Sequence, residues 1–207
     1  MLDAMVTALR ATSRTIADFL QAQFELDAAL SAFFKAPGTM RVLLNTPGEM
    51  QGNRAGLSVW LYRVVRDEST LNRPPERISP TLTRPVPLPV RLHYLMTPIT
   101  NVDGNDSQET ELVILGKVLQ CFHKHPRLFG TDLRDDFEGS DRLVTLRLEV
   151  LSLDELATTW DALSMPYRMS VSYEATVVDV DPGLEPDFAA PVRVPLQETG
   201  VIVGGGV

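Results

Sequence analysis

The residues of this chain best suited to bind a metal ion are a cysteine and two histidines near its middle. Cys121 and His125 are four residues apart, the spacing that places two side chains on one face of a helix, and His123 lies between them. A tetrahedral zinc site needs a second pair of ligands, and the chain has one cysteine and three histidines in all. The end of a helix also favours histidine, because the imidazole complements the helix dipole and the last carbonyl groups. We therefore expect a helix that ends at Pro126 and no metal site.

The other residues that could form a catalytic, calcium or phosphate-binding site do not have the neighbours or the spacing that such a site requires. His93 would need a Ser, Cys or Thr on a sharp turn beside it, and no G-x-S-x-G motif occurs, so we expect a structural histidine with satisfied hydrogen bonds. The run 101–107, NVDGNDS, has glycine at the fourth position of a calcium loop instead of the sixth. Gly116 and Lys117 lack the earlier glycine of a phosphate-binding loop. The sequence thus predicts no catalytic residue, no cofactor and no metal, and an enzyme of unrecognised type is the less favoured alternative.

Composition narrows the class of protein further. Of 207 residues, 44% are hydrophobic and 22% charged, which is typical of one soluble globular domain. The net charge of -8 argues against a nucleic-acid partner. A single cysteine excludes an internal disulfide, and polar residues interrupt every apolar run at the N-terminus, so we expect no signal peptide. No apolar run reaches the ~18 residues of a membrane span. We expect production in the cytoplasm and no direct membrane insertion.

The helices are predicted from apolar residues at steps of three and four. Residues 1–36 form a long helical region of one or two helices, with Thr12-Ser13 as the expected break and Pro37-Gly38 as the end. A second helix starts near Asp106, and Gly116 within it is expected to allow a close approach to a neighbour. A third follows the capping box of Ser152 and Glu155 and ends at 165–166. The expected buried stripes of the last two helices are Leu112, Leu115, Val118, Leu119 and Phe122, and Leu153, Leu156, Trp160 and Leu163.

The strands are predicted from alternation and from dense apolar runs. Residues 40–44 and 57–65 are the first two, and 57–65 is apolar on both faces, as in a central strand. The strands 90–96, 143–150 and 167–178 alternate. Their expected inward residues are Val90, Leu92, Tyr94 and Met96; Val144, Leu146, Leu148 and Val150; and Met169, Val171, Tyr173, Ala175 and Val177.

Two polar connections separate these elements. Residues 66–84 contain prolines and many charges, which predicts a long loop of the kind that is functional or disordered. Residues 130–142 predict an acidic surface loop, in which the four acids form a solvated face: Asp132, Asp135, Asp136 and Glu138.

The order of elements predicts an α/β (α+β) fold with a mixed, largely antiparallel sheet and helices packed on one face. We expect a single domain over residues 1–181, followed by an extended arm, 182–207, outside the compact fold. The arm has too few apolar residues for its own core but contains two β-prone runs, and extended segments of this kind commonly add a strand to a sheet edge of another subunit. We therefore expect the arm to become ordered against a neighbouring subunit, either another copy or a different protein of the same assembly. The apolar residues of these runs that we expect to make contacts are Val192, Val194, Leu196, Val201 and Ile202.

Several segments, in this order and spacing, resemble the tail-terminator (cap) family of phage-tail-like contractile injection systems of the antifeeding-prophage type. They are LSVWLYRV at 57–64, NRP at 72–74, PLP at 87–89, LHYL at 92–95, LGK at 115–117, HKHP at 123–126, LSLDEL at 151–156, WDAL at 160–163, PYR at 166–168 and SVSY at 170–173. Together they cover about residues 55–178. The longer N-terminal helical region and the arm after 181 do not match the family pattern.

The resemblance implies a tail-terminator-like subunit of a homohexameric ring. The ring would cap the baseplate-distal end of the inner tube and engage the last sheath layer, so the implied partners are other copies of the chain, the inner tube protein and the sheath protein. It implies no catalytic residues. It implies assembly into a contractile particle that is released or membrane-associated. A sheath-end or baseplate adaptor of the same particle is the alternative. On strand 57–65, the 66–89 connection and the next strand, we expect contacts from Trp60, Tyr62, Arg63, Arg73 and Arg91.

Overall fold

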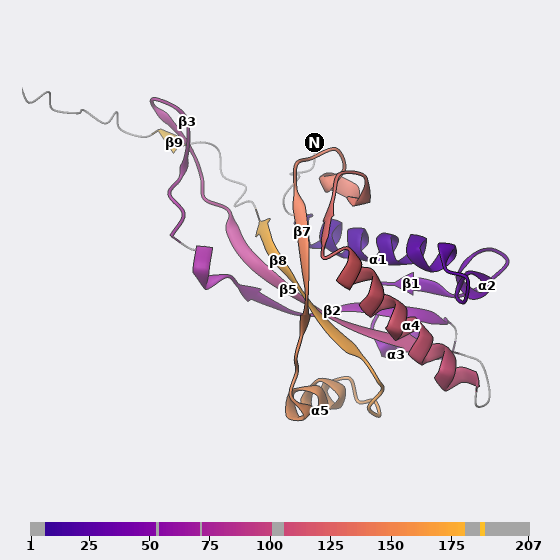
Figure 1. The fold of residues 1–207 in the computed structure, drawn as a ribbon. Coiled ribbons are helices and arrows are strands. Elements are labelled where there is room, and N and C mark those ends of the chain that lie inside the picture. Colours follow the sequence, from indigo (N-terminus) through magenta and orange to yellow (C-terminus); the bar gives the residue numbers. More distant parts are fainter. Residues whose placement is uncertain (1–6, 53, 71, 101–105, 181–186, 189–207) are drawn as a thin grey trace, which may run out of the picture.

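A computed structural model describes residues 7–52, 54–70, 72–100, 106–180 and 187–188 of the chain. Its centre is a six-stranded sheet in the order β1-β2-β5-β8-β7-β6 (Figure 1). The strands are β1 (Arg41–Leu43), β2 (Gly56–Arg66), β5 (Leu88–Ile99), β6 (Arg127–Phe129), β7 (Leu143–Glu149) and β8 (Val171–Val180). Only the β1–β2 pair is parallel, which confirms the predicted mixed, largely antiparallel sheet.

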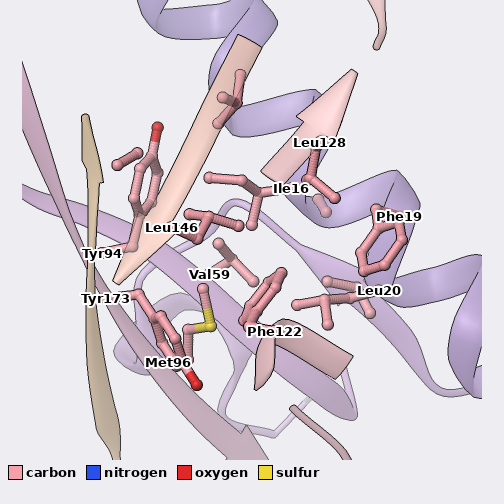
Figure 2. Packing of buried hydrophobic residues seen from close by; sticks show 14 of the residues in the cluster. Ile16, Phe19, Leu20, Val59, Tyr94, Met96, Phe122, Leu128, Leu146 and Tyr173 are labelled. Atoms are coloured by element: carbon pink, nitrogen blue, oxygen red, sulfur yellow. The ribbon is translucent and has the colours of Figure 1, made fainter. Parts of the chain in front are cut away.

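Two long helices cover one face of this sheet and form the core with it. They are α1 (Ala8–Leu26) and α4 (Asp106–Lys124). The Phe19 ring of α1 stacks on Phe122 of α4 at 6.1 Å, and Phe122 meets Tyr173 of β8 at 4.8 Å between ring centroids. Figure 2 shows these side chains converging with Tyr94 and Met96 of β5. This face therefore holds the main hydrophobic core.

Three shorter helices complete the fold: α2 (Ser31–Phe34), α3 (Pro47–Met50) and α5 (Leu153–Ala162). Helix α3 contacts β2 and β5, and the Ser58 hydroxyl donates to the Asn45 carbonyl just before it. Helix α3 is not among the predicted helices, although Thr46 and Glu49 form its capping box. The capping box of Ser152 and Glu155 predicted for α5 is confirmed.

The predicted break in the first helix is wrong. Thr12 and Ser13 lie inside α1, both buried, and their hydroxyls donate to the carbonyls of Ala8 and Leu9. Because these hydroxyls find acceptors within the helix, they do not interrupt it. The helix ends at Asp27 instead, whose carboxylate accepts hydrogen bonds from the next turn.

The prediction of a loop over 66–84 is also wrong. The segment forms a hairpin of β3 (Glu76–Ser79) and β4 (Leu82–Arg84), and β9 (Asp187–Phe188) pairs with β4. This small sheet projects from the end of the main sheet (Figure 1). Its strands have no buried face, so no hydrophobic alternation marks them in the sequence.

The acidic connection 130–142 is only in part the predicted solvated face: Asp136 and Glu138 are exposed, whereas Asp132 and Asp135 are partly buried. Leu133 and Phe137 are buried in the core. The Asp135 carboxylate lies 3.0 Å from the Arg10 guanidinium and 3.4 Å from that of Arg14, both on α1. The connection is thus packed onto the first helix by apolar anchors and ion pairs.

Several predicted core positions are exposed. Leu112 and Leu119 of α4 are 48% and 36% exposed, and no atom lies near enough to Gly116 to indicate a close helix contact, so these three predictions are wrong. Ile114 and Cys121 are buried in their place. The other exposed members of predicted inward sets are Leu148, Val150, Leu153 and Met169. The capping interactions expected at the start of α4 lie outside the described residues.

Candidate assembly surface

A β-bulge in β2 brings two predicted contact residues to the same side of the sheet. The register with β5 pairs Leu61 with Tyr94 and Arg63 with His93, so Tyr62 is an extra residue. A bulge of this kind places two successive side chains against one partner residue. Tyr62 and Arg63 therefore both lie beside His93, on the face opposite α1 and α4.

A hydrogen-bonded cluster forms around Glu149 on that face. Glu149 Oε2 accepts from the Ser172 hydroxyl at 2.7 Å and from the Tyr62 hydroxyl at 3.2 Å, and His93 Nδ1 lies 3.0 Å from Oε1. Burial of Glu149 opposes its charge, but the hydrogen bonds from Ser172 and His93 outweigh burial and lower its pKa. Burial raises the pKa of Tyr62. The cluster satisfies His93, as the sequence predicted for a structural histidine.

Arg91, two residues before His93 in β5, belongs to a second polar cluster. Its Nη2 lies 2.6 Å from Asp67 Oδ1, and its Nη1 lies 3.7 Å from Glu174 Oε2. The Asp67 side chain is completely buried and also accepts from Ser69 and Thr70. We call the surface formed by these two clusters the polar sheet face; its members are Tyr62, Arg63, Asp67, Arg91, His93, Glu149, Ser172 and Glu174.

Trp60 borders the polar sheet face. It is opposite Leu95 in the sheet register, and its ring lies 6.0 Å from that of Tyr62. The hydrogen bonds of the capping box lower the pKa of Glu155, and the positive charge of Arg63 makes a minor contribution in the same direction. Four predicted contact residues, Trp60, Tyr62, Arg63 and Arg91, thus lie on adjoining parts of one face.

Arg73 lies apart from them, beside the projecting hairpin. Its Nη1 is 3.0 Å from the Asp179 carboxylate near the end of β8. A groove of about 560 Å³ opens here between the hairpin and the ends of β7 and β8. Its charged lining residues are Arg73, Arg84, Arg142, Glu76, Asp141 and Asp179. The predicted contact residues of the arm, Val192, Val194, Leu196, Val201 and Ile202, lie outside the described residues.

The described residues do not form a metal site. No group of three or more His, Cys, Asp or Glu side chains among them is placed to hold a metal ion. Cys121 is buried, and burial raises the pKa of its thiol, which disfavours the nucleophilic thiolate. No helix in the described ranges is long and apolar enough to cross a membrane.

Sequence analysis missed half of the polar sheet face. The predicted inward set of strand 143–150 leaves Glu149 on the outer face, where it lies, but nothing in the sequence pairs it with His93. Asp67 lies in a segment taken as a loop, and Ser172 and Glu174 follow only from the alternation of β8. A strand-pairing register was the missing information, since it decides which residues of different strands meet.

Comparison with known proteins shows to which family the chain belongs. A family model described as the Pvc16 N-terminal domain matches residues 11–194. The chain belongs to the Pvc16 N-terminal domain family. The match includes α1 from Ala11 onward and the first part of the arm, so the family covers more of the chain than the 55–178 that its motifs indicated.

Two solved structures share the fold of this Pvc16 N-terminal domain protein. One is the sheath/tube terminator, in its extended state, of the extracellular contractile injection system PVC, with 19% identity over 84% of this chain and 60% of that chain and a TM-score of 0.53. The other is the tube-terminating cap of the anti-feeding prophage AFP, with 18% identity over 92% of this chain and 59% of that chain and a TM-score of 0.57. The present chain therefore spans about three-fifths of the length of either protein. No curated protein sequence matches it.

Proposed function

We propose that this chain is a subunit of a ring that terminates the tube and sheath of a contractile injection system at the end distal to the baseplate. The observation that supports this most is the family match over residues 11–194, since the two solved structures with the same fold are a sheath/tube terminator and a tube-terminating cap. The ring is a hexamer that contacts the inner tube protein and the sheath protein. The chain has no enzymatic activity, and it acts as part of a particle that is released or membrane-associated.

The geometry suits a ring subunit. Cyclic rings need two different surfaces on each copy that meet head to tail. The main sheet ends in the short β1 on one side and in the short β6 on the other, with the polar sheet face between them. Exposed apolar side chains lie near both ends, among them Leu44 just after β1 and Phe129 at the end of β6. The projecting hairpin adds a surface beyond the sheet (Figure 1).

Electron microscopy of purified particles tests the proposal. The chain is produced with a peptide tag in its natural particle, and the tag is labelled with gold. We expect label at one end only, opposite the baseplate, and particles of irregular tube length when the chain is deleted. Label at the baseplate would support the adaptor alternative. Label along the whole particle, or none, would contradict both.

A further inference from the structure

An apolar groove between α4 and β7 is open to solvent. Leu148 faces the same side of the sheet as the core residues Leu146 and Tyr173, yet it is 55% exposed because α4 does not extend over it. The groove has a volume of about 340 Å³ and is lined by Leu119, Phe122, His123, Leu146, Leu148 and Tyr173. Leu119 is 36% exposed at its rim. Part of the core-facing side of β7 is therefore uncovered in a single copy.

No described strand pairs with the outer edge of β7 at the same level. β6 pairs with β7 only from Leu143 to Thr145, and the Leu146 amide then donates to the Pro126 carbonyl. Among the described strands, none lies on that side of β7 over 147–149. An added strand there would find free backbone groups beside an apolar groove, the two requirements of β-strand addition.

The arm contains a segment with the right pattern. Val192, Val194 and Leu196 alternate with Arg193 and Pro195. In an extended strand the three apolar side chains lie on one face, and the peptide groups of the same residues point to one edge. The positions of Pro191 and Pro195 point to the opposite edge of the strand, which does not pair with β7. Their missing N–H groups therefore remove no hydrogen bond to β7, and proline is tolerated at such an edge.

The groove cannot take this segment from its own chain. Glu149 pairs with Ser172, near the start of β8, whereas the arm follows Val180 at the other end of the same strand. The eight residues from Ser172 to Val180 separate these two points by about 27 Å. Phe188 is paired with Leu82 in the hairpin, which projects further from that end (Figure 1). The four residues from Phe188 to Val192 span at most about 14 Å. Only another copy can bring its Val192 to Leu148.

We infer that residues 192–196 of one copy add a strand to the free edge of β7 in a second copy, with Val192, Val194 and Leu196 in the groove over Leu148. The inference rests on the proposed ring and names one of its contacts. Each copy then donates one segment and accepts one, which is the head-to-tail arrangement that closes a ring.

Two full-length variants with complementary defects test it. Leu148→Glu blocks the groove and leaves the arm intact, and Val194→Asp does the reverse. We expect each variant to be monomeric alone by analytical ultracentrifugation and a 1:1 mixture to form heterodimers, because one functional groove and one functional segment remain per pair. Val113→Glu, an exposed position on α4 outside the groove lining, should associate like the parent. A mixture that stays monomeric, or a variant that associates like the parent alone, would overturn the inference.

Disulfide trapping gives an answer that does not depend on a stable oligomer. One chain with Leu119→Cys and another with Val194→Cys are mixed and oxidised; the natural Cys121 is buried and is present in every sample as the background. We expect a cross-linked dimer, and at least a tenfold lower yield when Val113→Cys replaces Leu119→Cys. Equal yields would contradict the contact. If the cross-linked dimer forms but no gold label lies at the particle end, the proposed function is contradicted and this contact is supported. If the label lies at the particle end but no cross-linked dimer forms, this contact is contradicted and the proposed function is supported.

Discussion

The buried carboxylate of Asp67 has the most strongly shifted acidic pKa of the described residues. The Thr70 hydrogen bond lowers this pKa most, burial opposes it, and the bonds from Ser69 and Arg91 bring it to about 2. The ordinary value in an unfolded chain is about 3.9. Because the folded pKa is the lower one, ionised Asp67 stabilises the fold above about pH 4, and this stabilisation is lost as the pH falls toward 2.

The variant Asp67→Asn should therefore weaken the dependence of the unfolding free energy on pH below about pH 4. We expect the difference in unfolding free energy between parent and variant to be constant above about pH 4 and to shrink between pH 4 and 2. Urea denaturation at a series of pH values measures it. The control is Glu76→Gln, an exposed carboxylate of the hairpin that pairs with Arg84. A parent–variant difference that is independent of pH would refute this account of Asp67.

A second residue-scale prediction compares two positions of α5. Trp160 is 1% exposed and Leu153 is 81% exposed, although the helical spacing assigned both to one buried stripe. Trp160→Ala should lower the free energy of unfolding by about 3–5 kcal/mol, because it removes a large buried side chain and leaves a cavity. Leu153→Ala should change it by less than about 0.5 kcal/mol. Chemical denaturation of both variants decides, and similar losses would show that α5 packs differently.

At the scale of elements, α5 depends on its N-terminal cap. The Ser152 hydroxyl accepts from the Glu155 amide at 3.2 Å, and the Glu155 carboxylate accepts from the Ser152 amide at 2.9 Å. Ser152→Ala should cost about 1 kcal/mol of stability, because one amide of the first turn loses its partner. Thr158→Ala, exposed in the middle of the same helix, is the control and should be nearly neutral. Thermal and urea denaturation test both; an effect confined to Thr158→Ala would argue against the cap.

The elements also show what a sequence pattern can and cannot predict. The strand over 90–96 and the helix after Ser152 were predicted because hydrophobic alternation and capping chemistry are local. Leu148 was predicted inward and does face the core side, but its exposure depends on where α4 ends over the sheet. The extra residue Tyr62 is invisible in the sequence, since its effect exists only in the register with β5. The pairings within the polar sheet face are a product of registers, so they could not be predicted, although Tyr62, Arg63 and Arg91 were expected to make contacts.

At the scale of the whole molecule, the arm should be separable from the main fold. No strand of the six-stranded sheet follows Val180, and the only described pairing beyond it is β9 with β4. Truncation after Asp181 should leave the melting midpoint of the domain nearly unchanged and impair association of copies. Calorimetry and light scattering measure the two effects. A truncated chain that fails to fold would show that the arm is part of the core.

The intact chain should form a closed ring. We expect light scattering to give a mass six times the 22.9 kDa of one chain, because a cap on a six-fold tube must match its symmetry. Dilution should take the sample from ring to monomer with few intermediates, since only the closed form satisfies every contact. An open series of masses that grows with concentration would contradict ring closure.

The two bulges flanking β5 have a consequence for the direction in which the hairpin projects. β2 carries its extra residue opposite His93, and β8 carries one opposite Arg91, so both neighbours of β5 are one residue longer at the same level. Bulges increase local twist, which turns the outer ends of these strands, and the hairpin attached to them, away from the rest of the sheet. The two inserted residues thus contribute to the direction of that projection. If copies meet through it, loss or gain of a single residue there would retune the diameter of the ring while the packing beneath α1 and α4 stayed as it is.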